Sequence, residues 1–100
     1  MDRDTVLEMA VLRIVPGQEA AFEAAFAQAR LCLDGAQGHV GHSLHRGIEE
    51  PGVYLLQIHW QTLEDHTVVF RASPQHAQWK RLLSPFYEDR PQVTHHMPCA

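Results

Sequence analysis

Apolar residues recur along the chain with two spacings, the two-residue period of β-strands and the wider spacing of amphipathic helices. Strands are predicted over residues 5–15, 39–47, 53–60 and 92–97. Helices are predicted over residues 18–34, 62–71 and 73–83. This order is the ferredoxin-like β-α-β-β-α-β arrangement of an α+β domain, with a four-stranded antiparallel sheet and its helices on one face.

Several element boundaries carry residues that start or stop regular structure. Pro16 and Gly17 follow the first predicted strand and end it. Thr62, followed by acidic residues, has the pattern of a helix N-cap. Ser73 and Pro74 form a second start signal, with proline at the first helical position. The region after the third strand is therefore expected to be a helix pair.

Two of the predicted strands are apolar on both faces. In residues 5–15 and 53–60, aliphatic or aromatic side chains predominate on each of the two alternating faces. Helices of this fold cover only one side of the sheet, so the second apolar side needs another cover. We therefore expect a homodimer in which two sheets pack face to face.

Composition restricts the class of protein. The chain has 100 residues and is expected to form one domain over residues 5–98, after a flexible tail at residues 1–4. Its formal charge of −4 argues against nucleic-acid binding, and no apolar run is long enough to predict a membrane span. Cys32 and Cys99 lie far apart without a CxxC pattern, which favours a reduced, cytoplasmic protein.

Eight histidines first suggest a metal site. His39, His42 and His45 are three residues apart, but in a strand His42 is expected to point away from the other two. His95 and His96 are likewise expected to face opposite sides, and no HExxH motif accompanies them. No metal site is predicted. No GxGxxG, P-loop or GxSxG motif is present either, so no cofactor is expected.

His66 is the strongest candidate for chemistry. Helical spacing places it beside Leu63 and Phe70, on the face toward the sheet. There a neutral imidazole could act as a general base or donate to a substrate oxygen, or it could be a buried histidine bonded to the backbone. Trp60, at the end of a strand, could form the wall of a pocket for a flat ligand or belong to the core.

Four further side chains are candidates for substrate binding. Tyr54 could donate a phenolic hydrogen bond, and Arg71 could hold an acidic group of a substrate. Phe70 and Trp79 could contact an aromatic ring, although Trp79 also fits the apolar face of the last helix.

The segment WQTLEDHTVVFRASPQHAQWKRLLSPFY resembles the antibiotic biosynthesis monooxygenase (ABM) family of dimeric α+β barrels. The resemblance rests on a strand ending in Trp60, on Thr62 to His66, on Phe70-Arg71, and on the closing Val93 to His95. It extends over about residues 5–98. The haem-degrading members carry Asn, Trp and His near the positions of Glu8, Phe70 and Lys80, so the resemblance disfavours haem degradation.

The resemblance implies a cofactor-independent monooxygenase that acts with O2 on an aromatic or quinol-like small molecule. In such members the substrate is deprotonated to an electron-rich anion, which transfers an electron to oxygen. His66 and Trp60 would then be the catalytic residues. The alternative is a non-catalytic dimeric domain that binds a small hydrophobic metabolite or has a regulatory role.

Overall fold

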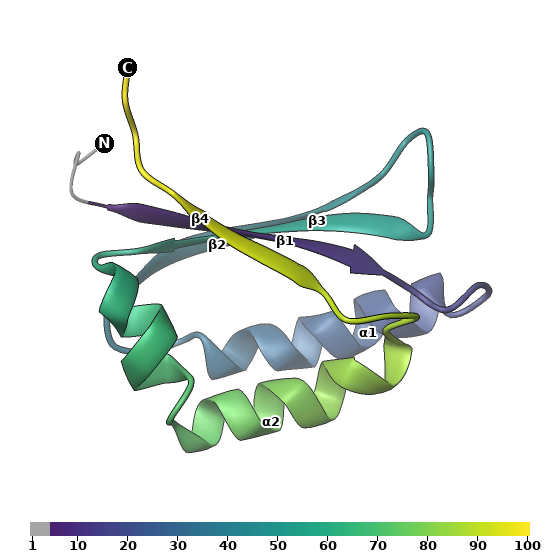
Figure 1. Cartoon of the computed structure of the whole chain (residues 1–100). Helices are drawn as coiled ribbons and strands as arrows, with labels where there is room; N and C mark the ends of the chain where they lie inside the picture. The colour runs from purple at the N-terminus through teal and green to yellow at the C-terminus, as the bar shows by residue number, and fades with distance from the viewer. Residues whose placement is uncertain (1–4) are drawn as a thin grey trace.

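The antiparallel sheet has the strand order β2-β3-β1-β4, and the helices cover one of its faces (Figure 1). A computed structural model describes residues 5–100; the tail expected at residues 1–4 lies outside them. The strands are β1 (Val6–Arg13), β2 (His39–Arg46), β3 (Val53–Trp60) and β4 (Gln92–His96). The helices are α1 (Glu19–Ala29) and α2 (Pro74–Leu83), with a π-helix, η2 (Asp65–Phe70), and 3-10 turns η1 (Arg30–Cys32) and η3 (Ser84–Phe86). The predicted ferredoxin-like α+β fold is confirmed.

The core fills the space between the sheet and the helices. Strand alternation sends every second side chain of β1 and β3 inward, and the register pairs Ala10 with Leu56 and Leu12 with Tyr54. Phe22 and Phe26 of α1 and Leu83 of α2 pack against these residues. The inward face of α1 is therefore part of the core. Within residues 5–100, no helix is long and apolar enough to cross a bilayer.

The opposite face of the sheet carries no helix (Figure 1). Leu7, Met9 and Val11 of β1, with Val53 and Leu55 of β3, occupy the alternate positions and are half-buried in the single chain. The second apolar face expected from the sequence is thus present in the fold.

The predicted helix cap at Thr62 has a reciprocal form. Asp65 donates its backbone N–H to Thr62 Oγ1 over 3.1 Å, and the Asp65 carboxylate accepts from the backbone N–H of Thr62 over 3.2 Å. Gln37 also donates to Asp65, over 2.9 Å. This buried carboxylate therefore joins the start of η2 to the loop before β2.

Gly38 lies directly against that carboxylate, and this contact makes a testable difference between two glycines. Gly35 and Gly38 both have positive φ, of 78° and 80°. A Cβ on Gly35 meets nothing within 4 Å, whereas one on Gly38 would overlap the Asp65 carboxylate and lie 2.7 Å from its Cβ. We expect Gly35→Ala to cost about 1 kcal/mol and Gly38→Ala about 3 kcal/mol or more in unfolding free energy, measured by urea denaturation. Equal losses would contradict the cap described for Asp65.

Candidate active site

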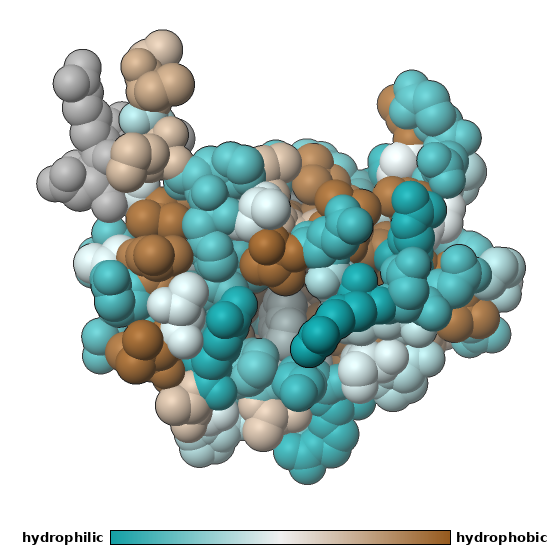
Figure 2. Space-filling view, in the orientation of Figure 1, coloured by the Kyte–Doolittle hydropathy of each residue, from teal (hydrophilic) through white to brown (hydrophobic). Residues whose placement is uncertain are grey.

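A cavity of about 350 Å³ lies between the sheet and the helices η2 and α2. Its volume is within the size range of small-molecule sites. Its apolar lining includes Leu12, Leu56, Ile58, Phe70, Trp79 and Val93. Its titratable lining consists of Glu8, His66, His76 and Tyr87, which are buried or half-buried, and of Arg71, Lys80 and Arg90, which are exposed. Figure 2 shows this side of the molecule hollowed near its centre, with hydrophilic residues on either side of the opening.

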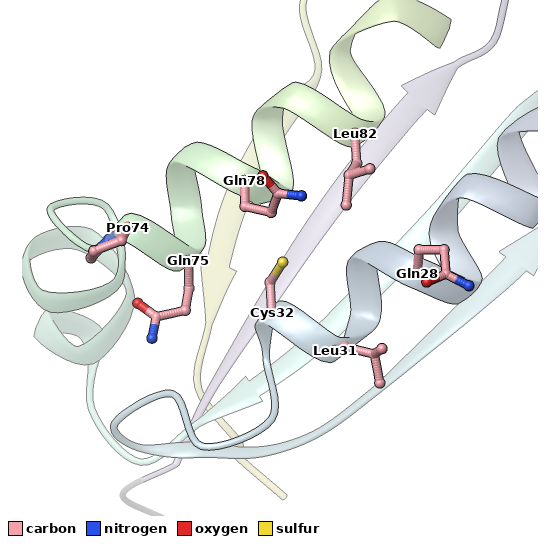
Figure 3. Close-up of a pocket in the computed structure, with 7 residues that line it drawn as sticks. All are labelled: Gln28, Leu31, Cys32, Pro74, Gln75, Gln78 and Leu82. Atoms are coloured by element: carbon pink, nitrogen blue, oxygen red, sulfur yellow. The ribbon is translucent and has the colours of Figure 1, made fainter.

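A larger hollow, of about 560 Å³, lies on the outer surface between α1 and α2. Figure 3 shows its lining: three glutamines, two leucines, Pro74, and Cys32, which points toward α2. None of these side chains is charged at neutral pH, and burial raises the pKa of the Cys32 thiol. The smaller cavity is therefore the better candidate for chemistry, because it contains the buried acid and the histidines.

Glu8 and two histidines form a chain of polar contacts at the inner end of this cavity. Glu8 Oε1 accepts a hydrogen bond from the Trp60 indole N–H over 2.9 Å and lies 3.4 Å from His66 Nε2. The other nitrogen of His66, Nδ1, lies 2.8 Å from Nε2 of His95. We name Glu8, His66 and His95 the Glu–His–His chain. It runs from a buried carboxyl to a half-exposed imidazole on the edge strand β4.

Strand pairing and ring stacking hold this chain in place. Glu8 is on the inward face of β1, and the antiparallel register places His95 of β4 directly opposite it. Trp60, at the end of β3, stacks on His66 with ring centroids 5.4 Å apart and an interplanar angle of 16°. Trp60 itself is fully buried, and its indole contacts both Glu8 and His66.

Burial controls the charge of these groups. It raises the pKa of Glu8, while the hydrogen bond from Trp60 and the charge of Arg71 act in the opposite direction. It lowers the pKa of His66 to about 4, helped by the charges of Arg71, His95 and His76. His66 is therefore neutral at pH 7, and both shifts disfavour an ionised Glu8–His66 pair. Tyr87, whose pKa burial and the charge of Glu8 raise to about 12, keeps its phenolic proton.

The lowered pKa of His66 predicts a pH-dependent stability. Between about pH 6.5 and pH 4 the unfolded chain binds a proton at this position and the folded chain does not. The part of the unfolding free energy that depends on His66 is therefore fully present above pH 6.5. It is lost as the pH falls toward 4, by up to about 3 kcal/mol. Urea denaturation at pH 5, 6 and 7 should show a weaker pH dependence for His66→Asn than for wild type. The exposed His45 serves as the control, because His45→Asn should keep the wild-type slope.

Comparisons with known proteins identify the family of this chain. The model of the antibiotic biosynthesis monooxygenase family matches residues 5–82. The chain belongs to this family. The uncharacterized protein YczJ of Bacillus subtilis (strain 168) is 47% identical over 90 residues, which are 90% of this chain and 95% of YczJ.

Solved structures of the antibiotic biosynthesis monooxygenase fold superpose closely. A Bordetella bronchiseptica protein that carries the family name is 38% identical, with a TM-score of 0.93 over 97% of this chain and 99% of that one. A variant of SnoaB, a cofactor-independent oxygenase from Streptomyces nogalater, is 19% identical, with a TM-score of 0.81 over 95% of this chain and 93% of that one. The similarity to SnoaB shows the shared fold.

Four of the six candidate residues predicted from the sequence lie together in the structure. His66, Phe70, Arg71 and Trp79 line the cavity. Trp60 lies behind His66 and outside the lining. The π-helix also changes the expected neighbours of His66: Phe70 is buried with it, whereas Leu63, expected on the same face, is 40% exposed.

Tyr54 lies at the other end of the sheet. Its hydroxyl donates to the carboxylate of Glu23 on α1, which also binds the guanidinium of Arg46 on β2. Tyr54 is 1% exposed, and this group of three side chains joins α1 to the sheet. The structure thus separates Tyr54 from the four candidates that line the cavity.

Two polar groups of the site were not selected from the sequence: Glu8 and His95. Glu8 is one acidic residue in an otherwise apolar strand face, and that break in the pattern is the signal that could have revealed it. His95 carries no such local signal, because its position depends on the pairing of β4 with β1.

The expectation that His42 points away from His39 was wrong. A β-bulge between His39 and Gly41 shifts the register of β2, so the two side chains turn to the same face. Nδ1 of His42 lies 3.3 Å from Nε2 of His39. Within residues 5–100, no group of three or more His, Cys, Asp or Glu side chains is arranged to hold a metal ion.

Proposed function

We propose that the protein is a cofactor-independent monooxygenase that acts with O2 on a small aromatic or quinol-like compound. The observation that carries the proposal is the Glu–His–His chain at the inner end of a 350 Å³ cavity with an apolar floor. Membership of the antibiotic biosynthesis monooxygenase family supports it. SnoaB, which shares the fold, is a cofactor-independent oxygenase.

The reaction begins with removal of a proton from a ring hydroxyl. Glu8 is the proposed acceptor, because burial raises its pKa above that of an ordinary carboxyl and so makes it a stronger base. His66 contacts both Glu8 and His95, so it connects the accepted proton to the half-exposed end of the chain. Tyr87 keeps its proton and is placed to donate a hydrogen bond to a substrate oxygen.

Electrons and atoms balance without a further reductant. The substrate anion gives one electron to O2, and the resulting radical and superoxide combine to form a C–O bond. The peroxide anion takes back the proton held by the Glu–His–His chain. The O–O bond then breaks, and loss of the carbon-bound hydrogen leaves a new carbonyl on the ring and one molecule of water. A hydroquinone would thus yield a hydroxyquinone, which has gained one oxygen atom and lost two hydrogen atoms, while the second oxygen atom leaves as water.

Oxygen uptake tests this function directly. We expect wild-type protein to consume oxygen with at least one member of a panel of hydroquinones and anthrones, faster than buffer alone. His66→Ala breaks the link between Glu8 and His95 and should reduce the rate strongly. A wild-type rate equal to the buffer rate across the panel would exclude the proposal. Ligand-induced thermal stabilisation without oxygen consumption would instead support a non-catalytic binding domain.

We also propose that the protein is a homodimer formed through the exposed sheet face. Leu7, Met9, Val11, Val53 and Leu55 present apolar surface on that face, and burial of such surface drives association. Analytical ultracentrifugation at micromolar concentration should give the mass of two chains, and Met9→Lys should shift the protein toward one chain. A wild-type protein that sediments as a single chain would contradict this assembly.

We also infer a cytoplasmic location. Cys32 and Cys99 are both free thiols, which supports it.

A further inference from the structure

Three positive side chains surround the opening of the cavity. Arg71 follows η2, Lys80 is on α2, and Arg90 precedes β4, so three separate segments supply them. All three side chains are exposed, and within residues 5–100 none of them forms a salt bridge. Elsewhere in the described chain, Arg13 and Arg46 do pair with glutamates. The cations at the opening are therefore available to a ligand.

The acidic side of the cavity lies at its inner end. Glu8 is the acidic residue that lines it, and Glu8 is 6% exposed. Leu56, Ile58 and Phe70 belong to the apolar lining of the same cavity, and Arg71 lies near enough to Glu8 for its charge to lower the pKa of that carboxyl. A ligand that fits this lining has an apolar ring and one negative group that the cations hold. Away from the cations, a negative group beside the buried Glu8 carboxyl would be opposed by repulsion and desolvation.

Arg71 is the most central of the three cations. Its charge acts on Glu8, His66, His76 and His95, so it lies near the whole polar part of the site. A guanidinium can form two parallel hydrogen bonds with a carboxylate or a phosphate. Lys80 and Arg90 also line the cavity and add positive charge to it.

We propose that the substrate is a ring compound with one carboxylate or phosphate group, bound with its ring on the apolar floor and its anionic group against Arg71, Lys80 and Arg90. This inference rests on the proposed function, since it names the substrate class for the same cavity.

Matched naphthalene ligands test the proposal by equilibrium binding, without any need for turnover. The probes are 1-hydroxy-2-naphthoate, its methyl ester, 1-naphthyl phosphate and 1-naphthol, titrated by calorimetry at low salt. Arg71→Gln removes the central cation. Arg81→Gln is the control, because Arg81, on α2, is also exposed but does not line the cavity.

We expect at least one of the two anionic probes to bind about tenfold more tightly than its uncharged partner, and the better anion identifies the preferred group. Arg71→Gln should remove most of that preference while leaving ester and naphthol binding unchanged, and Arg81→Gln should retain the preference. The proposal is overturned if the uncharged probes bind as tightly as both anions, or if Arg81→Gln reduces the preference as much as Arg71→Gln. Preferential anion binding without oxygen consumption would uphold the inference and reject the monooxygenase proposal alone.

Discussion

Glu8→Gln is expected to lower oxygen-dependent turnover by about 100-fold or more, because the variant removes the proposed proton acceptor from the Glu–His–His chain. Glutamine has nearly the same shape, and its side-chain oxygen can still accept the hydrogen bond from the Trp60 indole N–H. The fold should therefore be retained. The measurement is the initial rate of oxygen uptake with the best substrate of the hydroquinone and anthrone panel.

The control for this prediction is Glu49→Gln. Glu49 is exposed in the turn between β2 and β3, outside the cavity lining. Its substitution makes the same change of charge without touching the site. If Glu8→Gln retains the wild-type rate, or if both variants lose activity equally, Glu8 is not the base.

Trp60→Ala is expected to be the most destabilising of the core substitutions considered, with a loss of about 3–5 kcal/mol in unfolding free energy. Trp60 is fully buried, and its removal would leave a large cavity. It would also remove the hydrogen-bond donor to Glu8 and the ring that stacks on His66. Because domains of this size are stable by only about 5–15 kcal/mol, the variant should unfold at much lower urea concentration.

A pair of smaller substitutions separates packing from hydrogen bonding. Trp60→Phe and Trp79→Phe remove similar volume from two neighbouring parts of the core. The indole N–H of Trp60 donates to Glu8, whereas that of Trp79 has no acceptor among the described residues. We expect Trp60→Phe to cost about 1–3 kcal/mol more than Trp79→Phe in urea denaturation, since it leaves a buried carboxyl without its donor. Equal costs would show that the contact with Glu8 contributes little.

The fold was largely predictable from local patterns. Alternation in residues 53–60 matched β3 to the residue, and the start signals at Thr62 and Ser73 are both realised as caps. Local patterns failed where backbone geometry departs from the regular period. The bulge in β2 turned His42 to the side of His39, and the π-helix brought Phe70, but not Leu63, under the sheet with His66.

The site was only partly predictable, because its central contacts join residues far apart in the chain. Trp60 and Glu8 are 52 positions apart, and His66 and His95 are 29 apart. No helical or strand period relates such positions. The register of β1 against β3 and β4 brings them together, and an apolar pattern alone does not determine that register.

The edge strand β4 carries both a member of the Glu–His–His chain and part of the cavity wall. β4 is five residues long and pairs with β1 on one side only, so its end is expected to open more readily than the central strands. His95 and Val93 both belong to it, the first as the outer member of the chain and the second as part of the cavity wall. Opening of β4 would therefore separate His95 from His66 and remove Val93 from the cavity wall at the same time.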